Sequence, residues 1–104
     1  MQSNYVNKPG DFLKSSFDDM GWAYTPHGCE MPGSCRVHVA LHGCNQGYFK
    51  LGKTYMENTG YTQWAGPNKI VVIFPQIKAT SFNDSACWDF WGYTGDNYAT
   101  KDSI

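Results

Sequence analysis

The sequence predicts an α/β fold, a partial and mostly parallel sheet that contains a βαβ unit. Two apolar runs, residues 37–41 and 69–75, have the content of strands that are buried on both faces. The segment between them has room for a helical crossover and carries apolar residues at mixed helical intervals. Two buried strands joined by a helical connection form a βαβ unit with parallel strands.

Composition limits the classes of function. With 104 residues the chain is one domain at most. Eight basic and nine acidic side chains give a formal net charge of -1, so neither nucleic acid nor an anionic membrane surface is a predicted partner. No apolar run approaches the roughly 20 residues of a membrane span, and residues 1–11 lack the apolar core of a signal peptide.

The first third of the chain predicts little regular structure. Residues 1–19 are mostly polar and predict loop and edge structure. Residues 21–25 predict a short strand at or near a sheet edge, because Pro26 closes it. Residues 27–34 have turn chemistry, and joining Cys29 to Cys35 would close this loop.

The strand at residues 37–41 runs into His42 and Gly43, where glycine permits a sharp turn and a close approach to the peptide N–H groups that follow. In open α/β sheets, chemistry occurs beyond the carboxyl ends of the strands, so this turn is the candidate site. We expect His42 to be a structural hydrogen-bonding residue rather than a general base, because the chain offers no glycine-framed serine to pair with it.

Residues 45–52 predict a loop, and residues 53–66 predict one broken helix or two short ones, interrupted near Gly60. Residues 69–75 predict the strongest strand of the chain.

The last part of the chain begins with an aromatic segment at residues 87–93, which Cys87 can tie to another loop. We expect Asp89 to hydrogen-bond neighbouring backbone there. Residues 98–104 predict the start of a helix, with Thr100 or Asp102 as its N-cap.

The four cysteines stand at positions 29, 35, 44 and 87. An even number in a short chain with many polar loops favours two disulfides and an oxidising compartment. Free thiols and a zinc site that includes His38 and His42 are the alternatives. Zinc is disfavoured because the cysteines lack zinc-knuckle spacing and residues 37–41 would have to leave their strand. We therefore predict no metal, and nothing in the sequence calls for a cofactor.

Four sequence blocks follow one another in order: CRVHVALHGCNQ at residues 35–46, GYTQWA at 60–65, Asn68 with IVVIFPQ at 70–76, and CWDFW at 87–91. Together they resemble the secreted poly(3-hydroxybutyrate) depolymerases, which are serine esterases of the α/β-hydrolase class. The resemblance implies a secreted carboxylic ester hydrolase with a Ser-His-Asp triad that acts on a polyester or another ester substrate.

The resemblance also assigns roles to particular residues. It implies that the backbone N–H of Cys44 forms half of the oxyanion hole, on a structural turn made by His42, Gly43 and Gln46. It further implies a disulfide between Cys44 and Cys87, which would fix the direction of that N–H.

Trp88 and Trp91 are candidate substrate-binding residues, and packing against the sheet is their alternative role.

No Gly-x-Ser-x-Gly elbow occurs in the sequence. The resemblance places the elbow beyond the last block. We therefore expect residues 1–104 to be the N-terminal part of one α/β-hydrolase domain, truncated before the nucleophile elbow and inactive without the remainder of the esterase domain. The alternatives are a fragment of a feruloyl-type carbohydrate esterase, a Cys/His metal module, and a small disulfide-stapled module that presents Trp88, Trp91 and Tyr93 to a polymer.

Overall fold

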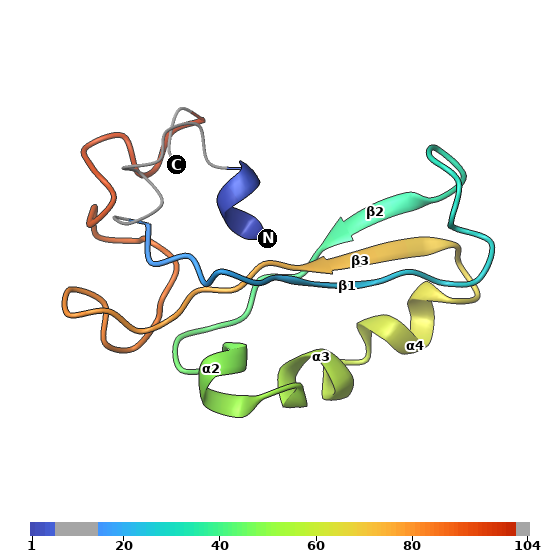
Figure 1. The fold of residues 1–104 in the computed structure, drawn as a ribbon, viewed down its shortest axis with the longest axis horizontal. Coiled ribbons are helices and arrows are strands. Elements are labelled where there is room, and N and C mark those ends of the chain that lie inside the picture. The colour runs from blue at the N-terminus through green and yellow to red at the C-terminus, as the bar shows by residue number, and fades with distance from the viewer. Residues whose placement is uncertain (6–14, 102–104) are drawn as a thin grey trace.

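The computed structural model describes residues 1–5 and 15–101 and has a small mixed sheet at its centre (Figure 1). The strand order is β1 (Trp22–Tyr24), β3 (Ile70–Phe74), β2 (Arg36–Val39). β2 pairs with β3 in parallel and β1 pairs with β3 in antiparallel orientation. The predicted βαβ unit and the edge position of β1 are confirmed. The sheet is mixed rather than mostly parallel, because one of its two strand pairs is antiparallel.

Three short helices connect β2 to β3 and lie in a row on one side of the sheet (Figure 1): α2 (Tyr48–Leu51), α3 (Thr54–Asn58) and α4 (Tyr61–Ala65). Gly60 separates α3 from α4 at φ 83°, a left-handed conformation that glycine adopts without strain. The expected pair of short helices is confirmed. α2 lies where the sequence predicted a loop, because a helix of four residues is too short to show a 3.6-residue period.

The core lies between the sheet and the helices. Val72 and Phe74 of β3 are buried against Met56 of α3 and Ala65 of α4, together with Ala40 after β2. Successive side chains of a strand point to opposite faces, so the residues between these positions face away from the helices.

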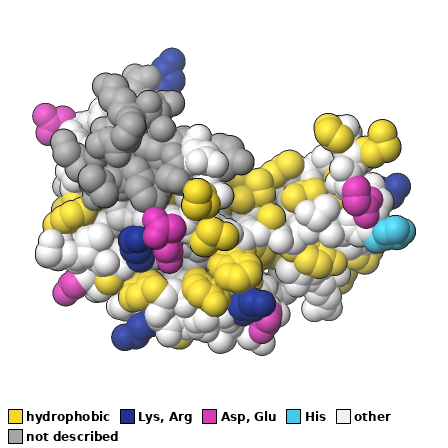
Figure 2. Space-filling view, in the orientation of Figure 1, with side chains coloured by type: hydrophobic (Ala, Val, Ile, Leu, Met, Phe, Trp, Pro, Cys, Tyr) yellow, Lys and Arg dark blue, Asp and Glu magenta, His cyan; other side chains and the backbone are white. Residues whose placement is uncertain are grey.

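The prediction that residues 37–41 and 69–75 form strands buried on both faces is wrong. β3 buries the face that carries Val72 and Phe74, whereas Ile73 on its other face is 37% exposed. β2 ends at Val39 and lies at an edge of the sheet, and Val37 and Val39 are 60% and 53% exposed. The register places them beside Val71 and Ile73, on the sheet face opposite the helices. Figure 2 shows hydrophobic side chains beside a hollow in the region where Figure 1 draws these strands. An apolar composition shows that a strand is suited to burial, but it does not show whether another layer packs on it. Within the described residues, no layer covers this face of the sheet.

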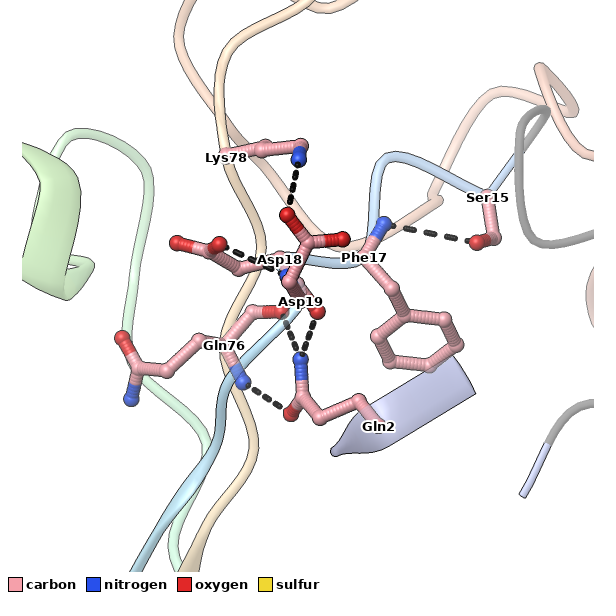
Figure 3. Close-up of polar contacts among 7 residues, drawn as sticks. All are labelled: Gln2, Ser15, Phe17, Asp18, Asp19, Gln76 and Lys78. Carbon is pink, nitrogen blue, oxygen red and sulfur yellow. Dashed lines mark hydrogen bonds and ion pairs between the residues drawn. The ribbon is translucent and has the colours of Figure 1, made fainter. Parts of the chain in front are cut away.

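The start of the chain is tied to the segment after β3 (Figure 3). The 3-10 helix η1 (Gln2–Tyr5) places the Gln2 side chain so that its Nε2 donates to the carbonyl oxygens of Asp18 (2.6 Å) and Gln76 (2.9 Å). Its Oε1 accepts the Gln76 N–H at 2.8 Å. Backbone hydrogen bonds of 2.9 Å from Asp18 to Gln76 and from Lys78 to Ser16 continue the pairing. The segment that follows β3 is therefore held on its outer side.

The predicted helix start near the C-terminus is only partly within the described residues. Residues 98–101 form turns and bends, and the Thr100 hydroxyl donates to the Asn97 carbonyl at 2.9 Å. Asp102, the other expected N-cap, lies outside the described residues, as do residues 6–14 of the polar N-terminal segment. None of the helices seen in the described part of the chain has the length and apolar content to cross a membrane.

Candidate functional site

The residues that follow β2 form a tight turn for local reasons. The Gly43 carbonyl accepts the Gln46 N–H at 3.1 Å, which closes a β-turn with Cys44 and Asn45 at its centre. Asn45 has φ 59°, and asparagine tolerates this left-handed conformation better than most residues.

The backbone N–H groups of this turn differ in whether they are occupied. The Gly43 N–H donates to Gln46 Oε1 at 2.9 Å. The Asn45 N–H donates to the Ser85 carbonyl at 2.7 Å. Cys44 is exposed, and its N–H finds no hydrogen-bond acceptor among residues 1–5 and 15–101. A backbone donor that is fixed in direction and unoccupied can receive an acceptor atom from outside the chain.

His42 supports the turn from the protein interior and is 2% exposed. Its Nε2 accepts the Ile77 N–H at 3.1 Å, and its Nδ1 lies 2.8 Å from the Gly43 carbonyl oxygen. Because a backbone amide can only donate, Nε2 holds a lone pair and Nδ1 carries the proton that it donates to Gly43. Neither ring nitrogen is left for proton exchange with a substrate. A Cβ on Gly47 would lie 2.8 Å from the Ile77 carbonyl oxygen, so this close packing needs glycine.

Two disulfides join Cys29 to Cys35 and Cys44 to Cys87, the same pairs as in the sequence analysis. All four cysteines are thereby unavailable as thiolate ligands for zinc. In the part of the chain that the structure describes, no three His, Cys, Asp or Glu side chains gather as metal ligands would.

The partner of Cys44 is itself firmly held. The buried side chain of Asn83 accepts the Cys87 N–H and donates to the Cys87 carbonyl, both at 2.9 Å. The Tyr93 hydroxyl donates to the same carbonyl at 2.9 Å. The disulfide therefore connects the turn to a rigid anchor. Sequence reasoning did not identify Asn83, because an asparagine four residues before a cysteine is too common a pattern to carry a signal.

The two candidate substrate-binding tryptophans lie in different environments. Trp88 is half-buried, with its ring centroid 5.8 Å from that of His42 and 5.7 Å from that of Phe17. Trp91 is 46% exposed, and its ring centroid lies 4.7 Å from that of the exposed Phe90. Trp88 thus packs behind the turn, and Trp91 belongs to an exposed aromatic surface.

The aromatic segment is folded around Asp89, as expected. Its carboxylate accepts the backbone N–H groups of Trp91 (3.1 Å), Gly92 (2.7 Å), Tyr93 (3.2 Å) and Thr94 (2.8 Å), and the Thr94 hydroxyl at 2.6 Å. Burial acts to raise the pKa of Asp89, but the hydrogen bonds from Thr94, Gly92 and Trp91 outweigh it and hold the pKa below its usual value.

No protein-family model matches the chain. A poly(3-hydroxybutyrate) depolymerase of Delftia acidovorans is 45% identical over 83 residues, which are 78% of this chain and 16% of that relative. A polyhydroxybutyrate depolymerase of Talaromyces funiculosus is 33% identical over 100 residues, 85% of this chain and 30% of the relative. The chain therefore spans less than a third of the length of these relatives.

Solved structures agree with the sequence relatives. A PHB depolymerase from Penicillium funiculosum superposes with a TM-score of 0.75 at 34% identity, over 86% of this chain and 31% of that chain. A serine-to-alanine variant of a PHB depolymerase, complexed with an R3HB trimer, superposes with a TM-score of 0.78 at 33% identity. The fold described above is thus similar to a part of these larger hydrolases.

Proposed function

We infer that this chain, which is related to the PHB depolymerases over part of their length, supplies one half of the oxyanion hole of a secreted carboxylic ester hydrolase. The proposed donor is the Cys44 N–H. The observation that carries this proposal is that this exposed amide is unoccupied within the described residues, while both amides beside it are hydrogen-bonded.

The proposed reaction is acyl transfer through a serine. A serine hydroxyl attacks the ester carbonyl carbon and gives its proton to a histidine, and negative charge develops on the carbonyl oxygen. A backbone N–H already aimed at that oxygen stabilises the charge without reorganising. The chain has no Gly-x-Ser-x-Gly, and both nitrogens of His42 are engaged, so the triad is assigned to the remaining segments of the domain.

The proposed substrate is a polyester of 3-hydroxybutyrate or a closely related ester. Support comes from the names of the two sequence relatives and from the R3HB trimer in one solved relative. Phe90 and Trp91 are 69% and 46% exposed in the segment that begins at Cys87, and flat apolar rings suit a methyl-bearing polyester. The two disulfides fit an oxidising compartment and so support secretion.

Ester hydrolysis by the chain alone and by an assembled domain tests the proposal. The assembled domain is this chain joined to the remaining segments of the esterase, which are taken from its own gene or from the fungal relative. Alone, the chain should release no nitrophenol from a short nitrophenyl ester above background. The assembled domain should hydrolyse this ester and 3-hydroxybutyrate oligomers, and a serine-directed phosphonate should block both activities. Turnover by the chain alone, or an inactive assembled domain, would refute the proposal.

The role of the Cys44 N–H is tested by replacing that one amide with an ester linkage through semisynthesis, which removes the donor and keeps the side chain. Loss of one oxyanion donor lowers kcat by roughly 100- to 1,000-fold in a well-studied protease, and a similar loss is expected here. The matched control replaces the amide of Gly33, in the exposed Cys29–Cys35 loop, and should leave kcat unchanged. Equal kcat values for the two proteins would exclude Cys44 as the donor.

A further inference from the structure

We propose that Gln46 is a positioning residue for this reaction: its side chain occupies the Gly43 N–H, so that the turn offers the ester oxygen a single donor, the Cys44 N–H. This inference rests on the proposed function and extends it to a side chain that touches neither the ester nor the triad.

Gln46 engages both backbone groups of Gly43. The side-chain Oε1 of Gln46 accepts the Gly43 N–H at 2.9 Å. The backbone N–H of Gln46 donates to the Gly43 carbonyl at 3.1 Å. A Cβ on Gly43 would lie 2.7 Å from Gln46 Oε1, so glycine at this position allows the side chain to fold across the turn. The Gly43 carbonyl also accepts a hydrogen bond from the His42 Nδ1–H, which fixes the plane of the Gly43–Cys44 peptide from the interior side.

The amides of Gly43 and Cys44 are adjacent, so each is a potential donor in the turn that follows β2. If the Gly43 N–H were also free, the turn would offer two neighbouring donors to water and to a substrate oxygen, and the position of that oxygen would be less well defined. The hydrogen bond to Gln46 removes the first donor from this competition. The geometry therefore makes the Gln46 side chain the element that selects which amide is presented.

The chemical type of the side chain also matters, because Gln46 supplies a neutral acceptor. A carboxylate of the same length would accept the same Gly43 N–H, but it would place a negative charge beside the oxygen on which negative charge develops. Gln46 is exposed, so its replacement leaves no cavity in the core. The positioning role can thus be separated from stability.

Three variants test this inference. Gln46→Met keeps the length and removes the acceptor, whereas Gln46→Glu keeps an acceptor and adds a charge. Gln63→Met changes an exposed glutamine on α4 and is the matched control.

The first readout is amide hydrogen exchange of residues 1–104 by NMR and needs no activity. In the parent chain, Gly43 should be protected and Cys44 should exchange rapidly. Gln46→Met should speed Gly43 exchange by about tenfold, which corresponds to the loss of one hydrogen bond. Gln46→Glu should leave Gly43 protected. A Gly43 amide that exchanges as rapidly as Cys44 in the parent would overturn the inference.

The second readout is kinetics of the assembled esterase on a nitrophenyl ester. Gln46→Met should lower kcat by about tenfold with KM within about twofold, because the lost contact acts on the transition state. Gln46→Glu should also lower kcat, and its kcat relative to the parent should recover as pH falls and the new carboxyl is protonated. A purely structural role predicts parental kcat for Gln46→Glu at every pH.

The two proposals fail in different ways. If the assembled parent cleaves no ester, the proposed function fails and this inference falls with it. If the parent is active and both Gln46 variants keep its kcat, the proposed function stands and only the positioning role is lost. Reduced kcat in both Gln46 variants and parental kcat in Gln63→Met would support both proposals.

Discussion

His42 contributes to the stability of the turn through a buried hydrogen bond to Ile77, a partly buried one to Gly43, and its packing against Trp88. His42→Ala leaves the Ile77 N–H without a partner and opens a cavity, so we expect it to lower the free energy of unfolding by about 2–4 kcal/mol. The matched control is His38→Ala, because His38 is exposed and its ring centroid lies 5.0 Å from that of Tyr61. We expect the control to cost less than about 1 kcal/mol. Urea unfolding measures both free energies, and equal losses would contradict the buried contacts assigned to His42.

Asp89 should make the aromatic segment sensitive to acid. Its pKa is lowered in the folded chain, so its contribution to stability is complete above the ordinary aspartate pKa of about 3.9 and is lost as pH falls below it toward the lowered folded value. Because the carboxylate is only partly buried, the effect should be local and modest. Tryptophan fluorescence and exchange of the Thr94 amide should show the segment loosening in that pH range. Asp89→Asn should remove the pH dependence, and a variant that retained it would contradict this assignment.

The two disulfides close loops of different length, with sequence separations of 43 residues for Cys44–Cys87 and 6 residues for Cys29–Cys35. In the chain-entropy model, loss of the disulfide that closes the longer loop lowers the free energy of unfolding by about 4 kcal/mol, and loss of the other lowers it by about 2 kcal/mol. Replacing both cysteines of a pair with alanine should reproduce this order in denaturant unfolding. The reverse order would show that the link between the turn and the aromatic segment stabilises less than its loop length predicts.

The elements that the sequence predicted well are those with a local cause. β1 and β3 lie within the predicted strands, because aromatic and β-branched runs favour them. The break at Gly60 follows from one left-handed residue. The burial of β2 was predicted wrongly, because it depends on a covering layer that the apolar pattern alone cannot place. The antiparallel direction of β1 was not predicted either, since a three-residue strand carries no directional signal.

The candidate site was predictable only in part. The glycine turn at the end of a strand was evident from the residues, and the role proposed for Cys44 came from the family resemblance. Which amide is left free could not be predicted. It depends on the Gln46 side chain folding back on Gly43, and on Ser85 coming from a distant loop to accept the Asn45 N–H.

In the part of the chain that the structure describes, the α-helices α2, α3 and α4 cover one face of the sheet, so the other face determines how the isolated chain behaves in solution. That face carries Val37, Val39 and Ile73, which are 60%, 53% and 37% exposed. Among residues 1–5 and 15–101, no strand pairs with the outer edge of β2. An apolar face beside an open strand edge promotes self-association. We therefore expect residues 1–104 alone to associate as their concentration rises, as measured by sedimentation velocity, and to bind a hydrophobic dye.

Lysine substitutions test whether the exposed apolar face of the sheet is covered by the rest of the domain or remains in contact with solvent. Val37→Lys with Val39→Lys should keep the isolated chain monomeric at higher concentration, whereas the control Gln63→Lys on α4 should leave association unchanged. In the assembled esterase the same pair of lysines should lower the free energy of unfolding by several kcal/mol, because charges would be buried without partners. If the two lysines reduce self-association of the isolated chain and also destabilise the assembled esterase, the rest of the domain covers this face. The opposite conclusion, that this face is exposed to solvent in the folded protein, would follow from either of two results. One is a parent chain that stays monomeric and melts cooperatively, and the other is an assembled domain whose free energy of unfolding is unchanged by both lysines.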